Sequence, residues 1–253
     1  MLSDLNGSTN GAPRIFKSID LNADLGEGFA NDQVLLDLVT SASICCNEHA
    51  GSIDVIQRTL AQAAERGVVV GAHPGYRDRE GFGRREQALT EEAVRELIRD
   101  QLDFIKSLAD EAGLVVRFLK PHGALYNQAQ REPEIARGVI ASLDGEAPLP
   151  LIGQPGSLLE QMAAARSIPY IPEGFPDRRY RDDGSLAPRS EPGAVLHDPA
   201  AMEAQVLRLV NDGRVATLCI HGDDPRAVAN AELVRRVLAG RGISIGSFLD
   251  VPT

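Results

Sequence analysis

Residues 217–234 read TLCIHGDDPRAVANAELV, and this stretch holds the pattern that organises the whole chain. An apolar run at 217–220 predicts a short strand, which His221 follows directly. Asp224 then stands before Pro225, as a capping carboxylate ahead of a proline at the first position of a helix. Apolar residues recur at helical spacing after that proline, so the stretch predicts a strand followed by a helix.

The same alternation runs through most of the chain. Capping residues predict further helices after Ser52, Thr90, Ser157 and Asp198, and the longest of these helices ends at Gly113. β-rich runs predict strands at residues 19–23, 42–46, 68–71, 115–120, 149–152, 169–171, 194–196 and 217–220. Strands that alternate with helices in about eight units are typical of an α/β fold with a parallel sheet.

The length of 253 residues fits one domain of barrel size, which we expect to span residues 15–253. Residues 1–14 are polar and rich in Gly, Ser and Asn, so they predict a disordered N-terminal tail. This segment has neither the basic start nor the apolar core of a signal peptide, and the three cysteines form no C-x-x-C pair. We therefore expect a cytoplasmic protein with reduced thiols.

Acidic residues outnumber basic residues by 36 to 26, which gives the chain a net charge of -10. This charge repels phosphate backbones and anionic lipids, so neither nucleic acid nor a membrane surface is an expected partner. The apolar runs also fall far short of the roughly 20 residues that span a bilayer. A small molecule is the expected substrate.

Histidines follow the predicted strands. All five come after β-rich runs, namely His49, His73, His122, His197 and His221. Parallel strands direct their carboxyl ends to one rim, where several loops build an active site. A single histidine in such a place more often packs or forms hydrogen bonds, but five of them predict convergence on one mouth.

Carboxylates line the first predicted strand. DLNADLGEG at residues 20–28 places Asp20, Asn22 and Asp24 two apart on one face, with Glu27 in the following turn. A buried polar face costs free energy unless its groups pair or bind something. These residues therefore either build a site or brace neighbouring segments through hydrogen bonds.

Lys120 ends another apolar run, in a loop that Pro121 and Gly123 restrict. A desolvated lysine at the rim can stabilise a developing anion, or act as a base with a lowered pKa. The alternative is a surface lysine. Residues 172–192 form a long polar loop, which we expect to be a mobile lid that brings Asp177, Arg178, Tyr180 and Arg189 toward ligand.

Two common nucleotide-binding fingerprints are missing from the sequence. G-x-x-x-x-G-K-[ST] does not occur, and the glycines at 26 and 28 are not completed to G-x-G-x-x-G. GISIG at 242–246 fits a nucleophile elbow, but that hydrolase order requires a histidine after the serine and none follows His221. Cys45 and Cys46 fit small buried thiols better than nucleophiles.

Eight motifs follow one another between about residues 18 and 240: DLNADLGEG, S-A-x-I-x-C with H-A-G, GAHPGY, GFGRR, KPHGALYN, GFPDRRYRDDGSLAPR, PGAVLHDP and TLCIHGDDP. In this order they resemble the LamB/YcsF family. The resemblance implies a variant (β/α) barrel of the glycoside hydrolase/deacetylase type. It also implies a subunit of an ATP-dependent 5-oxoprolinase, which opens the 5-oxoproline lactam to L-glutamate together with two companion oxoprolinase subunits and with ATP bound in the complex. Whether the chain also forms a homo-oligomer is left open.

This chemistry needs a base and a group that stabilises an oxyanion. The candidate catalytic residues are Asp20, Asp24, His73, Lys120 and His122. The candidate substrate-binding residues are Asn22, Glu27, His49, Arg84, Arg178, Tyr180 and His221.

The run at 41–52 departs from the family pattern S-A-N-I-A-C-G-F-H-A-G-D at Ser43, Cys45, Asn47, Glu48 and Ser52. Asn47 and Glu48 are expected to put a new amide and a new carboxylate beside the histidine that follows them. Two further hypotheses therefore stand. One is a metal-dependent, deacetylase-like hydrolase with a divalent ion on Asp24, His49 and His73. The other is a divergent, non-catalytic binding subunit.

Overall fold

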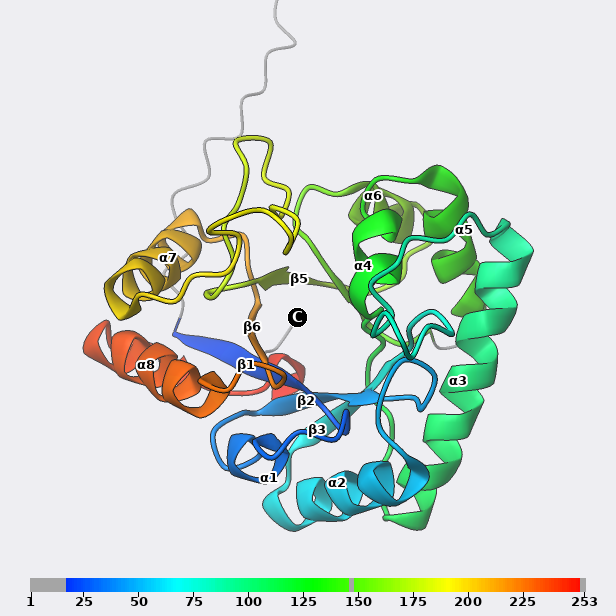
Figure 1. Ribbon diagram of the computed structural model, residues 1–253, viewed down its shortest axis with the longest axis horizontal. Helices are drawn as coiled ribbons and strands as arrows, with labels where there is room; N and C mark the ends of the chain where they lie inside the picture. Colours follow the sequence, from blue (N-terminus) through cyan, green and yellow to red (C-terminus); the bar gives the residue numbers. More distant parts are fainter. Residues whose placement is uncertain (1–16, 146–147, 251–253) are drawn as a thin grey trace, which may run out of the picture.

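The computed structural model describes residues 17–145 and 148–250. The tail predicted at residues 1–14 lies outside this part of the chain. The strands form one seven-stranded sheet (Figure 1). They are β1 (Ser18–Leu25), β2 (Ser41–Cys45), β3 (Val69–His73), β4 (Leu151–Gly153), β5 (Tyr170–Gly174), β6 (Thr217–His221) and β7 (Ser244–Ile245).

All paired strands run parallel, in the order β3-β2-β1-β6-β5-β4, and β7 pairs with β1 off this path. Leu119 closes the gap between the two ends of this order, because it forms a parallel bridge to Ala72 of β3 and another to Leu151 of β4. The amide of Lys120 donates to the carbonyl of Ala72 at 2.9 Å, and the amide of Ile152 donates to the carbonyl of Leu119 at 2.9 Å. The predicted strand at 115–120 is thus reduced to a short closing segment, and the predicted variant barrel is confirmed.

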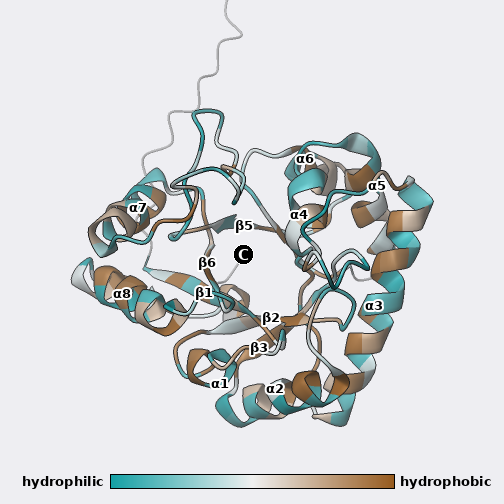
Figure 2. Ribbon diagram, in the orientation of Figure 1, coloured by the Kyte–Doolittle hydropathy of each residue, from teal (hydrophilic) through white to brown (hydrophobic). Residues whose placement is uncertain are grey.

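Helices surround the sheet on its outer side (Figure 1). They are α1 (Asp32–Leu35), α2 (Ile53–Arg66), α3 (Glu91–Glu111), α4 (Gly123–Ala129), α5 (Pro133–Ser142), α6 (Leu158–Ala165), α7 (Pro199–Asp212) and α8 (Ala227–Gly240). The 3-10 turn η1 (Phe248–Asp250) is not part of this outer layer. The longer helices carry both hydrophobic and hydrophilic residues, as expected when one face packs on the strands (Figure 2).

Side-chain caps explain where several helices begin. The side chains of Ser52, Thr90, Ser157 and Asp198 each accept a hydrogen bond from a backbone amide in the first turn of the following helix, as predicted. The prediction for Asp224 was wrong, because α8 starts at Ala227. Asp224 Oδ1 instead accepts from the amide of Arg226 at 2.8 Å, which favours a turn before the helix.

Other local predictions were also wrong. Residues 194–196 form no strand. That segment belongs to a folded loop with two isolated antiparallel bridges, Arg178 to Val195 and Tyr180 to Leu186. The segment at 172–192 is not a loop throughout, since β5 extends to Gly174. Sequence reasoning missed α1, α4, α5 and β7. None of the three helices has a side-chain cap, but α5 does begin at a proline and buries apolar residues at helical spacing, a signal that could have been found.

The interior of the barrel is polar over much of its length. Asp20 of β1 is buried there, and its carboxylate accepts hydrogen bonds from Thr40, Ser41 and Thr217. Burial raises the pKa of Asp20 to about 6, although these three hydroxyls oppose the shift. The Phe118 ring lies against Gly71 and packs edge-on against Phe248 of η1, with 5.5 Å between ring centroids.

Within the described residues, no helix has the length and apolar character needed to cross a membrane.

The burial of Asp20 predicts an unusual dependence of stability on pH. A carboxyl whose pKa is higher in the folded state stabilises the fold most below its unfolded-state value of 3.8, and loses that contribution as pH rises through about 6. Relative to an Asp20→Asn variant, the wild type should lose about 2 to 3 kcal/mol of unfolding free energy between about pH 4 and pH 7. Urea unfolding of both proteins across this range measures the difference. Parallel curves for the two proteins would show that Asp20 does not titrate in this way.

Candidate functional site

The candidate site lies at the carboxyl ends of the strands, where inward-facing residues of neighbouring strands stand side by side. Asp24 of β1 is in register with His221 of β6, and Cys45 of β2 is in register with His73 of β3. Because parallel strands end at the same rim, this register brings residues distant in sequence together. We call this end of the barrel the mouth.

Lys120 is the buried charge at the centre of the site. Its Nζ donates to Asp24 Oδ1 at 2.9 Å and to Asn22 Oδ1 at 3.2 Å, and it forms an ion pair with Glu173 Oε1 at 2.7 Å. Cys219 Sγ lies 3.1 Å from the same ammonium. The side chain is only 2% exposed. Two carboxylates, an amide oxygen and a thiol therefore enclose a single cation.

This enclosure decides the protonation state of Lys120. Burial alone lowers its pKa, but the negative charges of Asp24 and Glu173 outweigh that effect and raise the pKa well above the ordinary lysine range. The same ammonium, together with His73, holds the pKa of Asp24 well below its usual value despite burial. Lys120 is thus a permanent cation bound by protein carboxylates. Neither a surface lysine nor a base with a lowered pKa describes it.

Three histidines and one glutamate form a second buried group next to Lys120. Ring nitrogens of His49, His73 and His122 and a carboxylate oxygen of Glu27 all lie within 4.8 Å of one another. His49 Nε2 is 3.2 Å from Glu27 Oε1, and His122 Nδ1 is 3.5 Å from the same oxygen. The rings of His49 and His122 are stacked, with 3.8 Å between centroids. We call these four residues the histidine cluster.

The hydrogen bonds of the histidine cluster turn two ring nitrogens that carry no hydrogen toward each other. His73 Nδ1 is 2.8 Å from the carbonyl of Lys120, and His122 Nε2 is 2.9 Å from the carbonyl of Phe82. A carbonyl can only accept, so both of these nitrogens carry the hydrogen. In neutral rings, the lone pairs of His73 Nε2 and His122 Nδ1 then face each other at 2.9 Å. Only an added proton or a cation between them removes this repulsion.

Burial disfavours the added proton, because it lowers the pKa of both His49 and His122 well below the usual histidine value. Burial likewise raises the pKa of Glu27. Three imidazoles and one carboxylate are, in contrast, a common ligand set for Zn²⁺ and similar divalent ions. The outward hydrogen bonds of His73 and His122 to carbonyls are the kind that orient metal ligands. The cluster therefore fits a divalent metal.

The histidine cluster differs from the ligand set predicted from the sequence. It contains His49 and His73 as predicted, but Glu27 and His122 complete it. Asp24 Oδ1 is bound to Lys120, and Asp24 Oδ2 is 3.5 Å from His73 Nε2, so Asp24 stands beside the cluster. Asp24 instead groups with Cys219 and His221.

His221 and Asp177 form a hydrogen-bonded pair at the other side of the mouth. His221 Nδ1 lies 2.7 Å from Asp177 Oδ2, and the imidazole is stacked on the Phe175 ring with 5.4 Å between centroids. Asp177 is buried, and the charge of His221 keeps its pKa below the usual value although burial opposes this. A buried carboxylate on one ring nitrogen fixes the orientation of an imidazole and supports it as an acid or base. His221, with 12% of its side chain exposed, is also the most accessible of the converging histidines.

Two predicted substrate-binding residues are engaged inside the loop at 175–198. Arg178 is buried, and its guanidinium donates to the carbonyls of Ala187 and Ala194. The hydroxyl of Tyr180 accepts from the amide of Phe175 at 2.8 Å. Both side chains thus bond to backbone groups of the same loop. Any role of the two side chains toward a substrate stays a prediction, as does the mobility of the loop.

The remaining predicted residues occupy three levels. Arg84 lies at the mouth, where it pairs with Asp223. Asn22 lies deeper, beside Lys120, and its amide donates to Glu173 and Thr217. Asp20 is deepest, and its hydrogen bonds go to hydroxyl groups of the barrel wall, which matches the bracing role considered for it.

The predicted convergence of all five histidines was wrong for His197. Its segment forms no strand, and its ring contacts Arg226 at the surface. Sequence reasoning also missed Glu173 and Cys219 as partners of Lys120, and Tyr126, whose buried hydroxyl has no hydrogen-bond partner among the described residues. Glu173 was hidden because β5 was predicted to end before it. Cys219 could have been found from its place two residues before His221.

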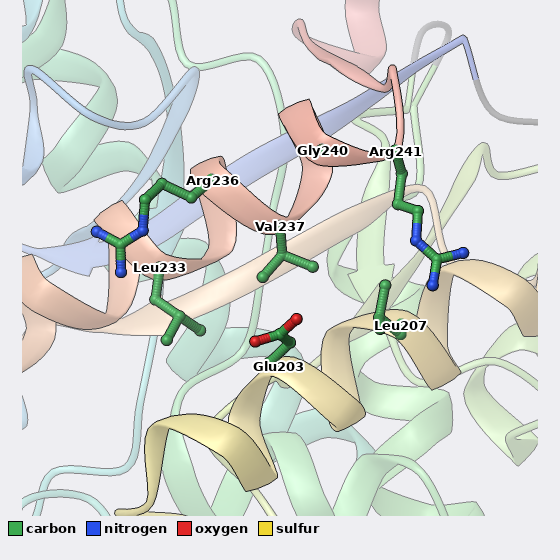
Figure 3. Close-up of a pocket in the computed structure, with 7 residues that line it drawn as sticks. All are labelled: Glu203, Leu207, Leu233, Arg236, Val237, Gly240 and Arg241. Atoms are coloured by element: carbon green, nitrogen blue, oxygen red, sulfur yellow. The ribbon is translucent and has the colours of Figure 1, made fainter.

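A surface groove between α7 and α8 lies apart from these residues (Figure 3). Leu207 and Glu203 of α7 face Leu233 and Val237 of α8 there, with Arg236, Gly240 and Arg241 at the edges. None of the residues that line it belongs to the histidine cluster or to the partners of Lys120.

Known proteins are similar to this chain over most of its length. The family model described as LamB/YcsF matches residues 19–252. This chain belongs to the LamB/YcsF family. Over 244 residues it is 43% identical to the A subunit of 5-oxoprolinase from Neisseria meningitidis serogroup C, and the match covers 91% of this chain and 100% of that protein. It is also 43% identical over 249 residues to the A subunit of 5-oxoprolinase from Methylococcus capsulatus, covering 91% and 96%.

Solved structures agree with the assignment to the LamB/YcsF family. The lactam utilization protein from Thermus thermophilus superimposes with a TM-score of 0.83 at 37% identity, covering 91% of this chain and 100% of that one. The catalytic domain of a peptidoglycan N-acetylglucosamine deacetylase from Eubacterium rectale superimposes with a TM-score of 0.56 at 15% identity, covering 97% and 96%. The second similarity is one of fold alone.

The departure from the LamB/YcsF pattern at Asn47 and Glu48 leaves the histidine cluster untouched. Asn47 has a φ of 65°, in the left-handed region that favours glycine, the residue of the family pattern at this position. Asparagine tolerates this region better than most residues, and Arg79 donates to both its carbonyl and its side chain. The carboxylate of Glu48 pairs with Arg77 at 3.4 Å, at the surface. The expected new groups beside His49 therefore point elsewhere.

The enclosure of Lys120 predicts a large loss of stability when its charge is removed. Lys120→Met leaves Asp24 and Glu173 buried without their cation, and such unpaired burial costs about 3 to 5 kcal/mol. Adding Glu173→Gln removes one of the two unpaired negative charges, so the double variant should be less destabilised than Lys120→Met alone. Chemical unfolding gives the unfolding free energy of the wild type, of Lys120→Met and of the double variant. Lys106→Met, on the exposed face of α3, is the matched control. If Lys120→Met were as stable as Lys106→Met, the buried ion pairs would not support the barrel.

Proposed function

We propose that this chain is the subunit of an ATP-dependent 5-oxoprolinase that opens the lactam ring of 5-oxoproline to L-glutamate. The observation that carries the proposal is the mouth itself, where an ionised carboxylate and a carboxylate-oriented imidazole stand next to the histidine cluster. The relatives that are named as the A subunit of 5-oxoprolinase match over nearly their whole length, which supports the same activity in this chain.

The chemistry of the substrate explains why ATP is needed. A five-membered lactam is an unreactive amide, and its carbonyl must be activated before water attacks. The sequence carries neither of the two glycine fingerprints that commonly cradle phosphates. We propose that activation by ATP takes place in an assembly with two companion subunits, while this chain supplies the residues for attack by water and ring opening.

Asp24 is placed to take the proton of the attacking water. Its Oδ1 is bound to Lys120, while Oδ2 has only His73 at 3.5 Å and Cys219 at 3.9 Å. The lowered pKa keeps this carboxylate ionised at neutral pH. As the oxygen of water bonds to the lactam carbon, its proton passes to Asp24.

His221 is placed to complete the ring opening. Asp177 holds its Nδ1, which leaves the other ring nitrogen available to a ligand. When the bond between the carbonyl carbon and the ring nitrogen breaks, the nitrogen takes a proton from His221 and becomes the amine of glutamate, and the proton held by Asp24 then passes through solvent to restore His221. Lys120 acts through Asp24, whose orientation and charge it fixes.

Glu27, His49, His73 and His122 would hold a divalent metal in this proposal. Such an ion supplies Lewis-acid stabilisation of charge on the carbonyl oxygen. Phe82 and the backbone of Lys120 keep the rings of His122 and His73 turned toward one point.

The proposed roles predict the activity of two histidine variants. His221→Gln should lower the release of glutamate from 5-oxoproline by about 100-fold or more, since a positioned general acid contributes at least this much. His197→Gln, the matched control at the surface, should keep wild-type activity. The measurement is glutamate release with ATP by the chain mixed with its two companion subunits. Equal activity of the two variants would remove His221 from the mechanism.

The assay also tests the division of labour between subunits. The chain without companions should release no glutamate, and the complete assembly should release it with ATP. ATP-dependent release by the chain alone would contradict the shared reaction. No release by the complete assembly would contradict the proposed function, and hydrolysis of an acetylated substrate instead would support the deacetylase-like hypothesis.

The histidine cluster predicts metal binding that does not depend on turnover. The purified chain should bind about one equivalent of Zn²⁺, and His122→Ala should weaken this binding by about 100-fold or more because a ligand is lost. His197→Ala should bind Zn²⁺ like the wild type. Titration with Zn²⁺ and elemental analysis measure both quantities. Equal affinity of the His122 and His197 variants would show that the cluster is not a metal site.

A further inference from the structure

Three loops bring a group of charged residues together over the mouth. Arg84 follows β3, Arg189 lies between β5 and α7, and Asp223 follows β6. Arg84 Nη2 bonds to Asp223 Oδ2, and Arg189 Nη1 lies 3.8 Å from the same oxygen. The charges of Arg189, His221 and Arg84 lower the pKa of Asp223 although burial opposes them, which agrees with a position at the same mouth as His221.

Both guanidinium groups keep unused hydrogen-bond donors. A guanidinium has five N–H groups in a planar fork. Arg84 spends one contact on Asp223 and lies over the Phe82 ring, 4.7 Å from its centroid. The Arg189 side chain has no hydrogen bond to any described residue. The side chains of Arg84 and Arg189 are 36% and 28% exposed, so a ligand at the mouth can reach them.

Positive charge exceeds negative charge at this place. Arg178 is buried beneath the loop, and its guanidinium is held by carbonyls that carry no net charge. Burial, and after it the charge of Arg189, lower the pKa of Arg178 to about 10, as expected where guanidinium groups gather. Asp223, Asp177 and Glu27 are the nearby carboxylates; Asp177 is already paired with His221, and burial raises the pKa of Glu27. A local excess of cations in a chain of net charge -10 indicates selection of an anion.

We propose that Arg189 and Arg84 form an anion subsite that binds the carboxylate of the lactam substrate. This inference rests on the proposed function, and it names the feature of 5-oxoproline that the chain recognises. A planar guanidinium matches a carboxylate through two parallel hydrogen bonds, and two of them on separate loops can fix the substrate ring in one orientation. Asp223 keeps the two guanidinium groups close together in the absence of ligand. A phosphate of ATP is also an anion that guanidinium groups bind, so the experiment must separate the two anions.

Direct binding to the chain tests the subsite without turnover. Calorimetric titration of the wild type should show tighter binding of 5-oxoproline than of 2-pyrrolidinone, the same lactam ring without a carboxylate. Arg189→Gln should weaken binding of 5-oxoproline by about 10- to 100-fold, the loss expected for a charged hydrogen bond, and should leave 2-pyrrolidinone unchanged. The matched control is Arg181→Gln on the same loop, whose guanidinium pairs with Glu191 at the surface and which should bind like the wild type.

Three outcomes would overturn the proposal. The wild type could bind both lactams equally, Arg181→Gln could be as impaired as Arg189→Gln, or Arg189→Gln could weaken binding of ATP while 5-oxoproline is unaffected. In the complete assembly, Arg189→Gln should raise KM for 5-oxoproline by a similar factor with little change in kcat. Selective binding of 5-oxoproline without glutamate release would leave the subsite standing and contradict only the proposed function.

Discussion

The buried ammonium of Lys120 is the constraint on which the rest of this barrel depends. A cation in a protein interior requires anions at contact distance, because its loss of hydration is otherwise uncompensated. Asp24 supplies one anion from β1 and Glu173 supplies the other from β5, and Asn22 lies between them and bonds to both Lys120 and Glu173. The polar face of β1 follows from this requirement. Apolar residues at these positions would leave the buried ammonium of Lys120 without a partner.

Lys120 also joins the two halves of the candidate site. Its side chain holds Asp24, while its backbone carbonyl accepts the hydrogen of His73 Nδ1 at 2.8 Å and so turns the other ring nitrogen toward the histidine cluster. One residue therefore fixes both an ionised carboxylate and the tautomer of an imidazole. The histidine cluster and the partners of Lys120 lie side by side, with 3.5 Å between His73 Nε2 and Asp24 Oδ2.

The sequence predicts the fold well where short-range physics decides it. Caps such as Thr90 and Asp198, and the strand ends marked by His73 and His221, lie where they were expected. Prediction failed where long-range contacts decide. The apolar run before Lys120 becomes a closing segment because only Leu119 bridges to both of its neighbours, and His197 leaves the mouth because its segment belongs to a folded loop.

The site follows the same division. Strand periodicity groups Asp20, Asn22 and Asp24 on one face, but it cannot show that Asp20 faces only hydroxyl groups while Asp24 meets a lysine. The roles of Glu27 and His122 depend on distances between loops that are far apart in sequence. Positions at and after predicted strands identified most of the relevant residues, and the contacts in three dimensions divided them between the partners of Lys120 and the histidine cluster.

The closure of the ring at Leu119 has a mechanical consequence. Elsewhere, neighbouring strands are joined by ladders of two to five paired residues, whereas this seam has a single bridge on each side. Backbone hydrogen bonds of residues 117–120 with β3 and with residues 150 and 152 support these bridges, but so short a seam still depends on further contacts to stay closed. The next residue along the seam is Lys120, whose ion pairs reach across the lumen to β1 and β5. The ion pairs of Lys120 thus stabilise the closure of the barrel where the pairing of strands is short. The residues that shape the chemistry of the site therefore also hold the barrel closed.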